Sequence, residues 1–174
     1  MNFDTIDYLR DGTPRQREAY AVLTSHNVLT KLEPFTPILV GTIPIAIDIE
    51  TSDLDIICCW TDRKAFSDAV RAVFGQERAF EIRESAEPGR EVVVANFEMD
   101  GFAIEIFGQN RPTREQFAYR HMVIEHRLLV ERGEEFRQAV IDLKRKGYKT
   151  EPAFGQLLGL TDNPYVQLLA YENN

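Results

Sequence analysis

The spacing of apolar positions divides the 174-residue chain into a helical start, a strand-rich middle and a helical final third. The first 34 residues carry apolar side chains at helical intervals, and Thr13 and Gln16 flank a Pro in the arrangement of a helix-capping box. A helix is therefore expected to begin near Pro14.

The middle of the chain has the pattern of strands. Short segments rich in Ile and Val, interrupted by Pro and Gly, predict strands in FTPILVGT, IAIDI and DLDIICCW. RAFEIRES and REVVVANFEMDGFAIEIFG predict three more strands, and the last two join at a tight turn in the sequence MDG. Between these groups a helix is expected over 62–74, capped by Thr61 and stopped by Gly75.

The final third returns to helical spacing. Thr113 and Gln116 suggest a second capping box, from which a long helix should run to about Arg132. Its apolar stripe consists of Phe117, His121, Ile124 and Leu128. Gly133 should separate this helix from the next, which Gly147 ends, and two short helices follow in TEPAFGQLLGL and NPYVQLLAYEN.

These elements predict an α+β protein with a mixed or antiparallel sheet, flanking helices and a helical C-terminal third. We expect an α/β core with N-terminal helices over 1–110 and a helical part over 111–174 packed on it, as one continuous structural unit. No basic start precedes an apolar run and no apolar stretch approaches ~20 residues, so neither a signal peptide nor a membrane span is predicted. Cys58 and Cys59 are adjacent in an expected strand and are poor disulfide partners, which favours a reduced, cytoplasmic protein.

The net charge of −8 disfavours an extended nucleic-acid surface. The charge is uneven, however: residues 1–110 hold 10 basic and 19 acidic side chains, whereas residues 111–149 hold 10 basic and 6 acidic ones. The basic segment could form a phosphate-binding wall or could simply be solvated helix faces, and the charge pattern leaves both open.

Two carboxylates interrupt an otherwise apolar strand. Asp53 and Asp55 are two residues apart, so both project from the same face, about 6–7 Å apart along the chain. Side by side they repel, and a divalent cation such as Mg²⁺ or Mn²⁺ would remove that repulsion. Glu105 lies in a second apolar strand, and three carboxylates from two strands are enough to hold two metal ions about 3.5–4 Å apart for phosphoryl displacement.

A Gly-Thr pair precedes the acidic strand. Gly41 allows a ligand to approach the backbone closely, and Thr42 adds a hydroxyl for a phosphate oxygen. An anion-binding turn upstream of a metal-binding strand suits a nucleoside triphosphate.

The order of Gly41-Thr42, Asp53-Leu54-Asp55 and Ile104-Glu105-Ile106 resembles the nucleotidyltransferase superfamily with the polymerase-beta-type fold. Over about residues 15–170, stretches such as FAYRHMVIEHRLL, KTEPAFGQLLGL and NPYVQLL more closely resemble a small bacterial family of unknown function placed in that superfamily.

The resemblance implies roles for individual residues. Asp53 and Asp55 would hold the metals, Glu105 would be the third acid that activates an acceptor hydroxyl, and Gly41 and Thr42 would cradle the phosphates. Further candidates for phosphate binding are Ser52, Lys64 and Arg120. The superfamily usually has Ser at the position of Thr42 and Asp at the position of Glu105, and the longer Glu moves the carboxylate outward.

Structural interpretations stand beside these roles. The aspartates could be strand-end acids facing water, Glu105 could face solvent, and Lys64 and Arg120 could form surface ion pairs. His121 lies on the apolar stripe and is expected to be a satisfied core histidine.

Two functions from different classes follow. The first is a Mg²⁺-dependent nucleotidyltransferase that moves a nucleoside monophosphate from an NTP, with ATP as the first candidate, to an unknown hydroxyl acceptor. The alternative is a catalytically weak nucleotide-binding regulatory or antitoxin-like module of the same fold, which would need a protein partner.

Overall fold

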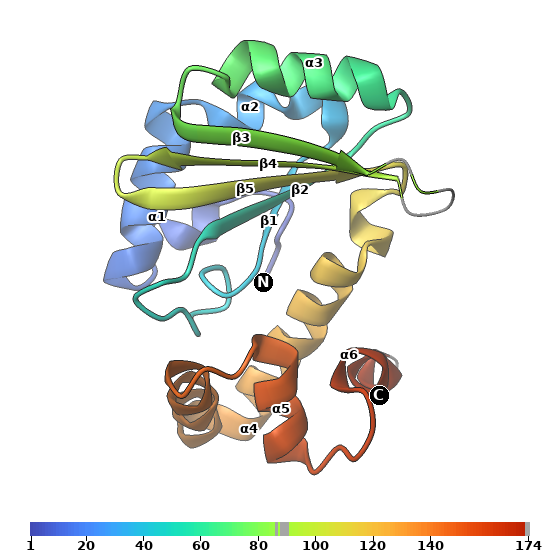
Figure 1. Cartoon of the computed structure of the whole chain (residues 1–174). Coiled ribbons are helices and arrows are strands. Elements are labelled where there is room, and N and C mark those ends of the chain that lie inside the picture. The colour runs from blue at the N-terminus through green and yellow to red at the C-terminus, as the bar shows by residue number, and fades with distance from the viewer. Residues whose placement is uncertain (86, 88–90, 173–174) are drawn as a thin grey trace.

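A five-stranded mixed sheet forms the centre of the computed structural model, which describes residues 1–85, 87 and 91–172. Its strand order is β1-β2-β5-β4-β3 (Figure 1), with β2 and β5 parallel and every other neighbouring pair antiparallel. The strands are β1 (Ile38–Val40), β2 (Leu54–Cys59), β3 (Arg78–Ser85), β4 (Val92–Met99) and β5 (Phe102–Gln109). The α+β class and the mixed sheet expected from the sequence are confirmed.

Helices cover the two faces of the sheet in two groups (Figure 1). The first group comprises α1 (Pro14–Ser25), α2 (Val28–Lys31) and α3 (Arg63–Phe74). The second comprises α4 (Phe117–Arg145), α5 (Thr150–Leu158) and α6 (Pro164–Gln167). Short 3-10 turns occupy Asp7–Leu9, Glu33–Phe35, Thr113–Glu115 and Leu168–Tyr171.

Alternate residues of the central strands enter two separate cores. Ile56 of β2 and Ile106 of β5 pack with α1 and α3 in the first core. Ile57 of β2 packs with α4 and α5 in the second core, and Phe107 of β5 packs against it. Side chains alternate along a strand, so residues two positions apart share a face. Asp55 precedes Ile57 by two positions and Glu105 precedes Phe107 by two, so both acids also face the α4 side.

Several local predictions are confirmed. Thr13 and Gln16 form a complete capping box at the start of α1. Asp100 and Gly101, with φ of 45° and 82°, make the turn between β4 and β5. Gly133, with φ of 80°, interrupts the helical geometry of α4 at the predicted break.

Three local predictions are wrong. IAIDI is not a strand: it lies in the loop between β1 and β2, and Ile45 and Ile47 are buried because they pack in the second core. Asp62, rather than Thr61, caps α3 by accepting a hydrogen bond from the Ala65 amide. The box at Thr113 and Gln116 does not form: the Gln116 side-chain amide donates to the Cys58 carbonyl at 3.0 Å, and α4 starts at Phe117, three residues later than such a box would start it.

Among the residues that the structure describes, no helix combines the length and the apolar character needed to cross a bilayer.

Candidate functional site

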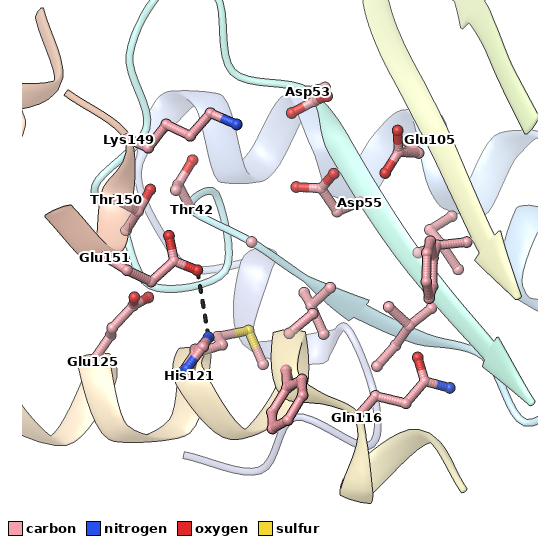
Figure 2. Close-up of a pocket in the computed structure, with 18 of the residues that line it drawn as sticks. Thr42, Asp53, Asp55, Glu105, Gln116, His121, Glu125, Lys149, Thr150 and Glu151 are labelled. Carbon is pink, nitrogen blue, oxygen red and sulfur yellow. Dashed lines mark ion pairs between the residues drawn. The ribbon is translucent and has the colours of Figure 1, made fainter. Parts of the chain in front are cut away.

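Asp55 and Glu105 are register partners on the parallel strands β2 and β5. Both are half-buried and both line one cavity, together with the more exposed Asp53 that precedes β2. The three acids predicted from the sequence are therefore brought to one place, where Figure 2 shows their side chains around the start of β2.

The electrostatics of this cluster follow from its burial and its like charges. Burial, reinforced by the charges of Asp53 and Glu105, raises the pKa of Asp55 to about 7. Burial and Asp53 likewise raise the pKa of Glu105, against the opposing influence of Arg83 and Asn96. The cluster therefore holds more negative charge than its surroundings neutralise.

The Gly-Thr turn lies directly against the cluster. Gly41 has φ of 86°, and a Cβ at this position would come within 2.2 Å of Asp55 Oδ2. The Thr42 hydroxyl donates to the Ser52 hydroxyl at 3.1 Å, and the Ser52 hydroxyl accepts from the Ile49 amide at 2.9 Å. Gly41 and Thr42 line the cavity, while Ser52 supports Thr42 from within the loop.

Basic side chains of α4 hold the loop between β1 and β2 in place. Lys144 Nζ donates to the Ile47 carbonyl at 2.7 Å, and Arg137 donates to the carbonyls of Ile45 and Ala46. At the surface, Arg145 pairs with Glu50 at 2.9 Å. Part of the basic segment noted in the sequence thus stabilises the loop that follows the Gly41-Thr42 turn.

The cavity has a volume of about 710 Å³ and lies between β2–β5 and the C-terminal helices. Besides the acids and the Gly-Thr turn, its polar and aromatic lining comes from α4, α5 and the segments beside them: Gln116, Phe117, His121, Glu125, Lys144, Lys149, Thr150, Glu151 and Tyr165. The carboxylate cluster and the Gly41-Thr42 turn therefore share one space, whose volume is large enough for a nucleotide.

Three candidates from the sequence do not line this cavity: Ser52, which contacts it only through Thr42, and the two cations Lys64 and Arg120. Lys64 lies on α3 and pairs with Asp68 at 2.5 Å. Arg120 makes a two-point contact with Glu172, at 2.9 Å and 2.6 Å. Both thus engage in the surface ion pairs that the sequence left open for them.

His121 is buried, as expected, and satisfies one ring nitrogen by donating from Nε2 to the Tyr165 carbonyl at 2.8 Å. Its other nitrogen, Nδ1, lies 3.4 Å from Glu151 Oε1, which the dashed line in Figure 2 marks. The histidine is a core residue that also forms part of the cavity wall.

The fit to a metal rests on the donor chemistry. Asp53, Asp55 and Glu105 offer carboxylate oxygens, the ligands that Mg²⁺ and Mn²⁺ prefer, and a dication would offset the burial and the repulsion that together raise the pKa of Asp55. In the described part of the chain, however, no three His, Cys, Asp or Glu side chains are already arranged to hold a metal ion. The donor set suits a divalent cation, and its side chains would have to turn toward a common point to bind one.

Sequence reasoning missed the wall formed by α4 and α5. Phe117, His121 and Glu125 follow one another at intervals of four residues, so they share one helix face. The spacing of His121 and Glu125, two titratable residues one turn apart beside an apolar stripe, was the signal that the sequence offered. The place of Glu125 opposite the carboxylate cluster depends on how α4 packs, which the helical period does not specify.

Comparison with solved structures shows a nucleotidyltransferase fold. A Cid1 poly(U) polymerase structure with MgGTP bound superposes with a TM-score of 0.58 at 14% identity, covering 90% of this chain and 49% of that one. A Cid1 structure described by its RNA terminal uridylyl transferase activity gives 0.56 at 13% identity, covering 88% and 47%. The GLD-2/RNP-8 complex gives 0.54 at 13% identity, covering 88% and 63%. The chain spans about half the length of these Cid1 chains, and identities this low show the fold alone.

No curated protein matches the chain. The family described as "Domain of unknown function (DUF4269)" matches residues 21–171, which is most of the chain. The protein belongs to this DUF4269 family and has the nucleotidyltransferase fold.

Proposed function

We propose that this protein is a Mg²⁺-dependent nucleotidyltransferase that moves a nucleoside monophosphate from an NTP to a hydroxyl acceptor. The observation that carries the proposal is the shared cavity, in which Asp53, Asp55 and Glu105 face the Gly41-Thr42 turn. The nucleotidyltransferase fold of the chain supports it.

In this proposal Asp53 and Asp55 hold the metal, which supplies positive charge to the triphosphate when bound. Gly41 and Thr42 bind phosphate oxygens, and the Ser52 hydroxyl orients Thr42. Lys144 and Lys149, which also line the cavity, add positive charge for the leaving pyrophosphate.

Glu105 is assigned to the acceptor. Its carboxylate takes the proton of the acceptor hydroxyl as the hydroxyl oxygen forms a bond to the α-phosphorus. The bond from that phosphorus to the bridging oxygen of the β-phosphate breaks at the same time, and pyrophosphate leaves with the electron pair. Positioning and charge neutralisation then supply most of the acceleration.

The second candidate is a nucleotide-binding module of the same fold with little turnover. One observation favours it: the described carboxylates are not already arranged around a metal position. Such a module would bind an NTP through the Gly41-Thr42 turn and act through a protein partner.

The test uses the purified protein, each of the four NTPs labelled at the α-phosphate, and Mg²⁺ or Mn²⁺. Pyrophosphate release together with labelling of an acceptor, or of the protein itself, supports the transferase. The matched control is Asp53→Asn, which removes one metal ligand from an exposed position and should abolish the signal. NTP binding without pyrophosphate under every condition favours the binding module, whereas no NTP binding contradicts both.

A further inference from the structure

The row of side chains that contains Asp55 and Glu105 continues onto a third strand. Asn96 of β4 is the register partner of Glu105 on one side, as Asp55 of β2 is on the other. Ala95 and Phe97, the neighbours of Asn96 along β4, pack in the first core. Asn96 therefore points to the opposite face of the sheet, where the acids lie. Residues directly opposite each other on antiparallel strands have Cβ atoms about 4.5–5.5 Å apart, so their side chains are within reach of a hydrogen bond.

The side-chain amide of Asn96 contains a buried donor. Its Nδ2 is shielded from solvent and has no hydrogen-bond partner among the residues that the structure describes. Burial and the charge of Asp53 raise the pKa of Glu105, and the Asn96 amide opposes that rise. The amide therefore lies close to the Glu105 carboxyl without being aligned with it. Because an unpaired buried donor destabilises a protein, a small rotation that aligns the two groups is favourable.

Other carboxylates near Asn96 are weaker candidates for this donor. Glu81 of β3 is the second register partner of Asn96, but its side chain is exposed, so water competes for its oxygens. Glu98, two residues further along β4, forms an ion pair with Arg78. Glu105 is half-buried, and a hydrogen bond to a carboxylate is stronger where water is excluded. Glu105 is therefore the acceptor that suits the Asn96 amide best.

The strand order gives such a hydrogen bond a direction. The Gly41-Thr42 turn follows β1, which lies on the far side of β2 from β5 and β4. If Asn96 holds the Glu105 oxygen nearer to β4, the other oxygen is directed toward Asp55 and the phosphate-binding side of the site. A glutamate has one more rotatable bond than an aspartate, so more rotamer freedom must be removed to fix its carboxylate. A fixed donor on the adjacent strand removes part of that freedom.

We propose that Asn96 is a positioning residue, whose Nδ2 donates to one Glu105 oxygen and directs the other toward the acceptor hydroxyl. The inference rests on the proposed function and adds a residue of β4 to the site. A general base must reach the proton that it takes, and such hydrogen bonds are often long in a ligand-free protein and tighten in the complex. A misplacement of about 1 Å can lower a rate by about 10²-fold. Asn96 therefore acts on the rate of transfer and not on NTP affinity.

The first test is single-turnover transfer by Asn96→Val beside equilibrium NTP binding, with the full chain, Mg²⁺ and pyrophosphate release as the readout. Valine removes the amide and favours a strand, so lost transfer would not come from a weakened β4. The rate should fall by about tenfold or more while NTP affinity stays within about threefold. Glu81→Gln, an exposed change at the other register partner of Asn96, should keep the wild-type rate.

A double variant separates positioning from a general effect on the sheet. Once Glu105→Gln has removed the proton acceptor, adding Asn96→Val should lower the remaining rate by less than about twofold, because both changes act through the same carboxylate. A change that only loosened β4 would instead multiply with the effect of Glu105→Gln.

The second test needs neither metal nor acceptor. Urea unfolding is compared for the wild-type protein, Asn96→Ala, Glu105→Ala and the protein with both changes. If the two side chains interact, the combined change in the unfolding constant should differ from the product of the two single changes by about threefold or more.

The outcomes distinguish this inference from the proposed function. An active wild-type protein with an equally active Asn96→Val variant, or effects of Asn96→Val and Glu105→Gln that multiply in full, overturns the inference and leaves the proposed function standing. A wild-type protein that never releases pyrophosphate overturns the proposed function. The unfolding comparison then decides whether Asn96 holds Glu105: coupled effects support it and independent effects overturn it. If Asn96→Val does not fold, Asn96→Ala takes its place in the transfer measurements.

Discussion

Asp55 and Glu105 occupy paired positions on two parallel strands, with both side chains on the face that α4 covers. This pairing concentrates like charge in a partly buried place, where burial and the neighbouring acids raise the pKa of Asp55 to about 7. The arrangement weakens the fold unless a cation is bound, so the stability and the binding capacity of the protein should respond in opposite directions to the same substitution.

Asp55→Asn should abolish metal-dependent NTP binding while leaving the metal-free protein equally or more stable. A carboxyl whose pKa is raised on folding loses stability as the pH rises from about 4 to about 7, because the unfolded chain ionises first. At pH 8 the variant should therefore gain about 1–2 kcal/mol in unfolding free energy. Urea unfolding beside Mn²⁺ and NTP calorimetry measures both effects. Unchanged Mn²⁺ and NTP affinity would refute the role of Asp55 in the metal site.

Gly41→Ala should disrupt the site through Asp55. The new Cβ would come within 2.2 Å of Asp55 Oδ2, so the carboxylate must move, and the φ of 86° adds backbone strain of about 1 kcal/mol. Gly101→Ala is the matched control, since Gly101 has φ of 82° and nothing within 4 Å of the added Cβ. Both proteins should lose similar stability in chemical unfolding, and only Gly41→Ala should lose NTP binding. Equal NTP affinity in the two variants would show that the turn does not position Asp55.

Lys144→Met should loosen the loop that carries Gly41 and Thr42. The change leaves the buried Ile47 carbonyl without its 2.7 Å donor, which costs about 1–3 kcal/mol. Arg145→Gln removes only an exposed pair with Glu50, which water and salt screen, and should leave the stability almost unchanged. Hydrogen exchange across residues 41–53 should accelerate in the first variant alone. Equal exchange rates in both variants would mean that the loop is held by its own buried isoleucines.

Glu125 should leave a pH signature in stability. Its folded pKa is raised to about 8, so the wild-type protein loses stability between about pH 5 and pH 7.5, while Glu125→Gln has no such group. The melting temperature of the variant relative to wild type should therefore rise across this window by several degrees, at about 2–4 °C per kcal/mol. A gap that stays constant from pH 5 to pH 7.5 would contradict a buried, proton-binding Glu125.

The sequence predicts the sheet well where its pattern is local. The alternation in FAIEIFG places Glu105 opposite the Ile side chains, and the MDG turn fixes the register of β4 with β5. The segment IAIDI shows the limit of such reasoning, because its alternate isoleucines have the sequence pattern of a strand although the segment is a loop. Side chains from α4, about 90 residues later, satisfy the carbonyls of this loop, and no short-range pattern reports that contact.

The candidate site likewise has one part that the sequence predicts and another that only the tertiary packing brings together. Asp53, Asp55, Gly41 and Thr42 lie within 15 residues of one another, and the antiparallel pairing of the neighbouring strands β1 and β2 brings them together. Glu125 and Glu151 reach the cavity through the packing of α4 against α5, which depends on tertiary contacts. Lys64 and Arg120 carry the right charge for phosphate, but each has a nearer acid with which it pairs.

The most direct test of the central claim is single-turnover nucleotide transfer by Glu105→Gln beside equilibrium NTP binding. The substitution keeps the size of the side chain and removes the charge that accepts the proton of the acceptor hydroxyl. If the protein is a transferase with Glu105 as its third acid, NTP affinity should stay within a few-fold and turnover should fall by ~10²-fold or more. A Glu105→Gln protein as active as wild type, or a wild-type protein that binds NTP and never releases pyrophosphate, would contradict the account.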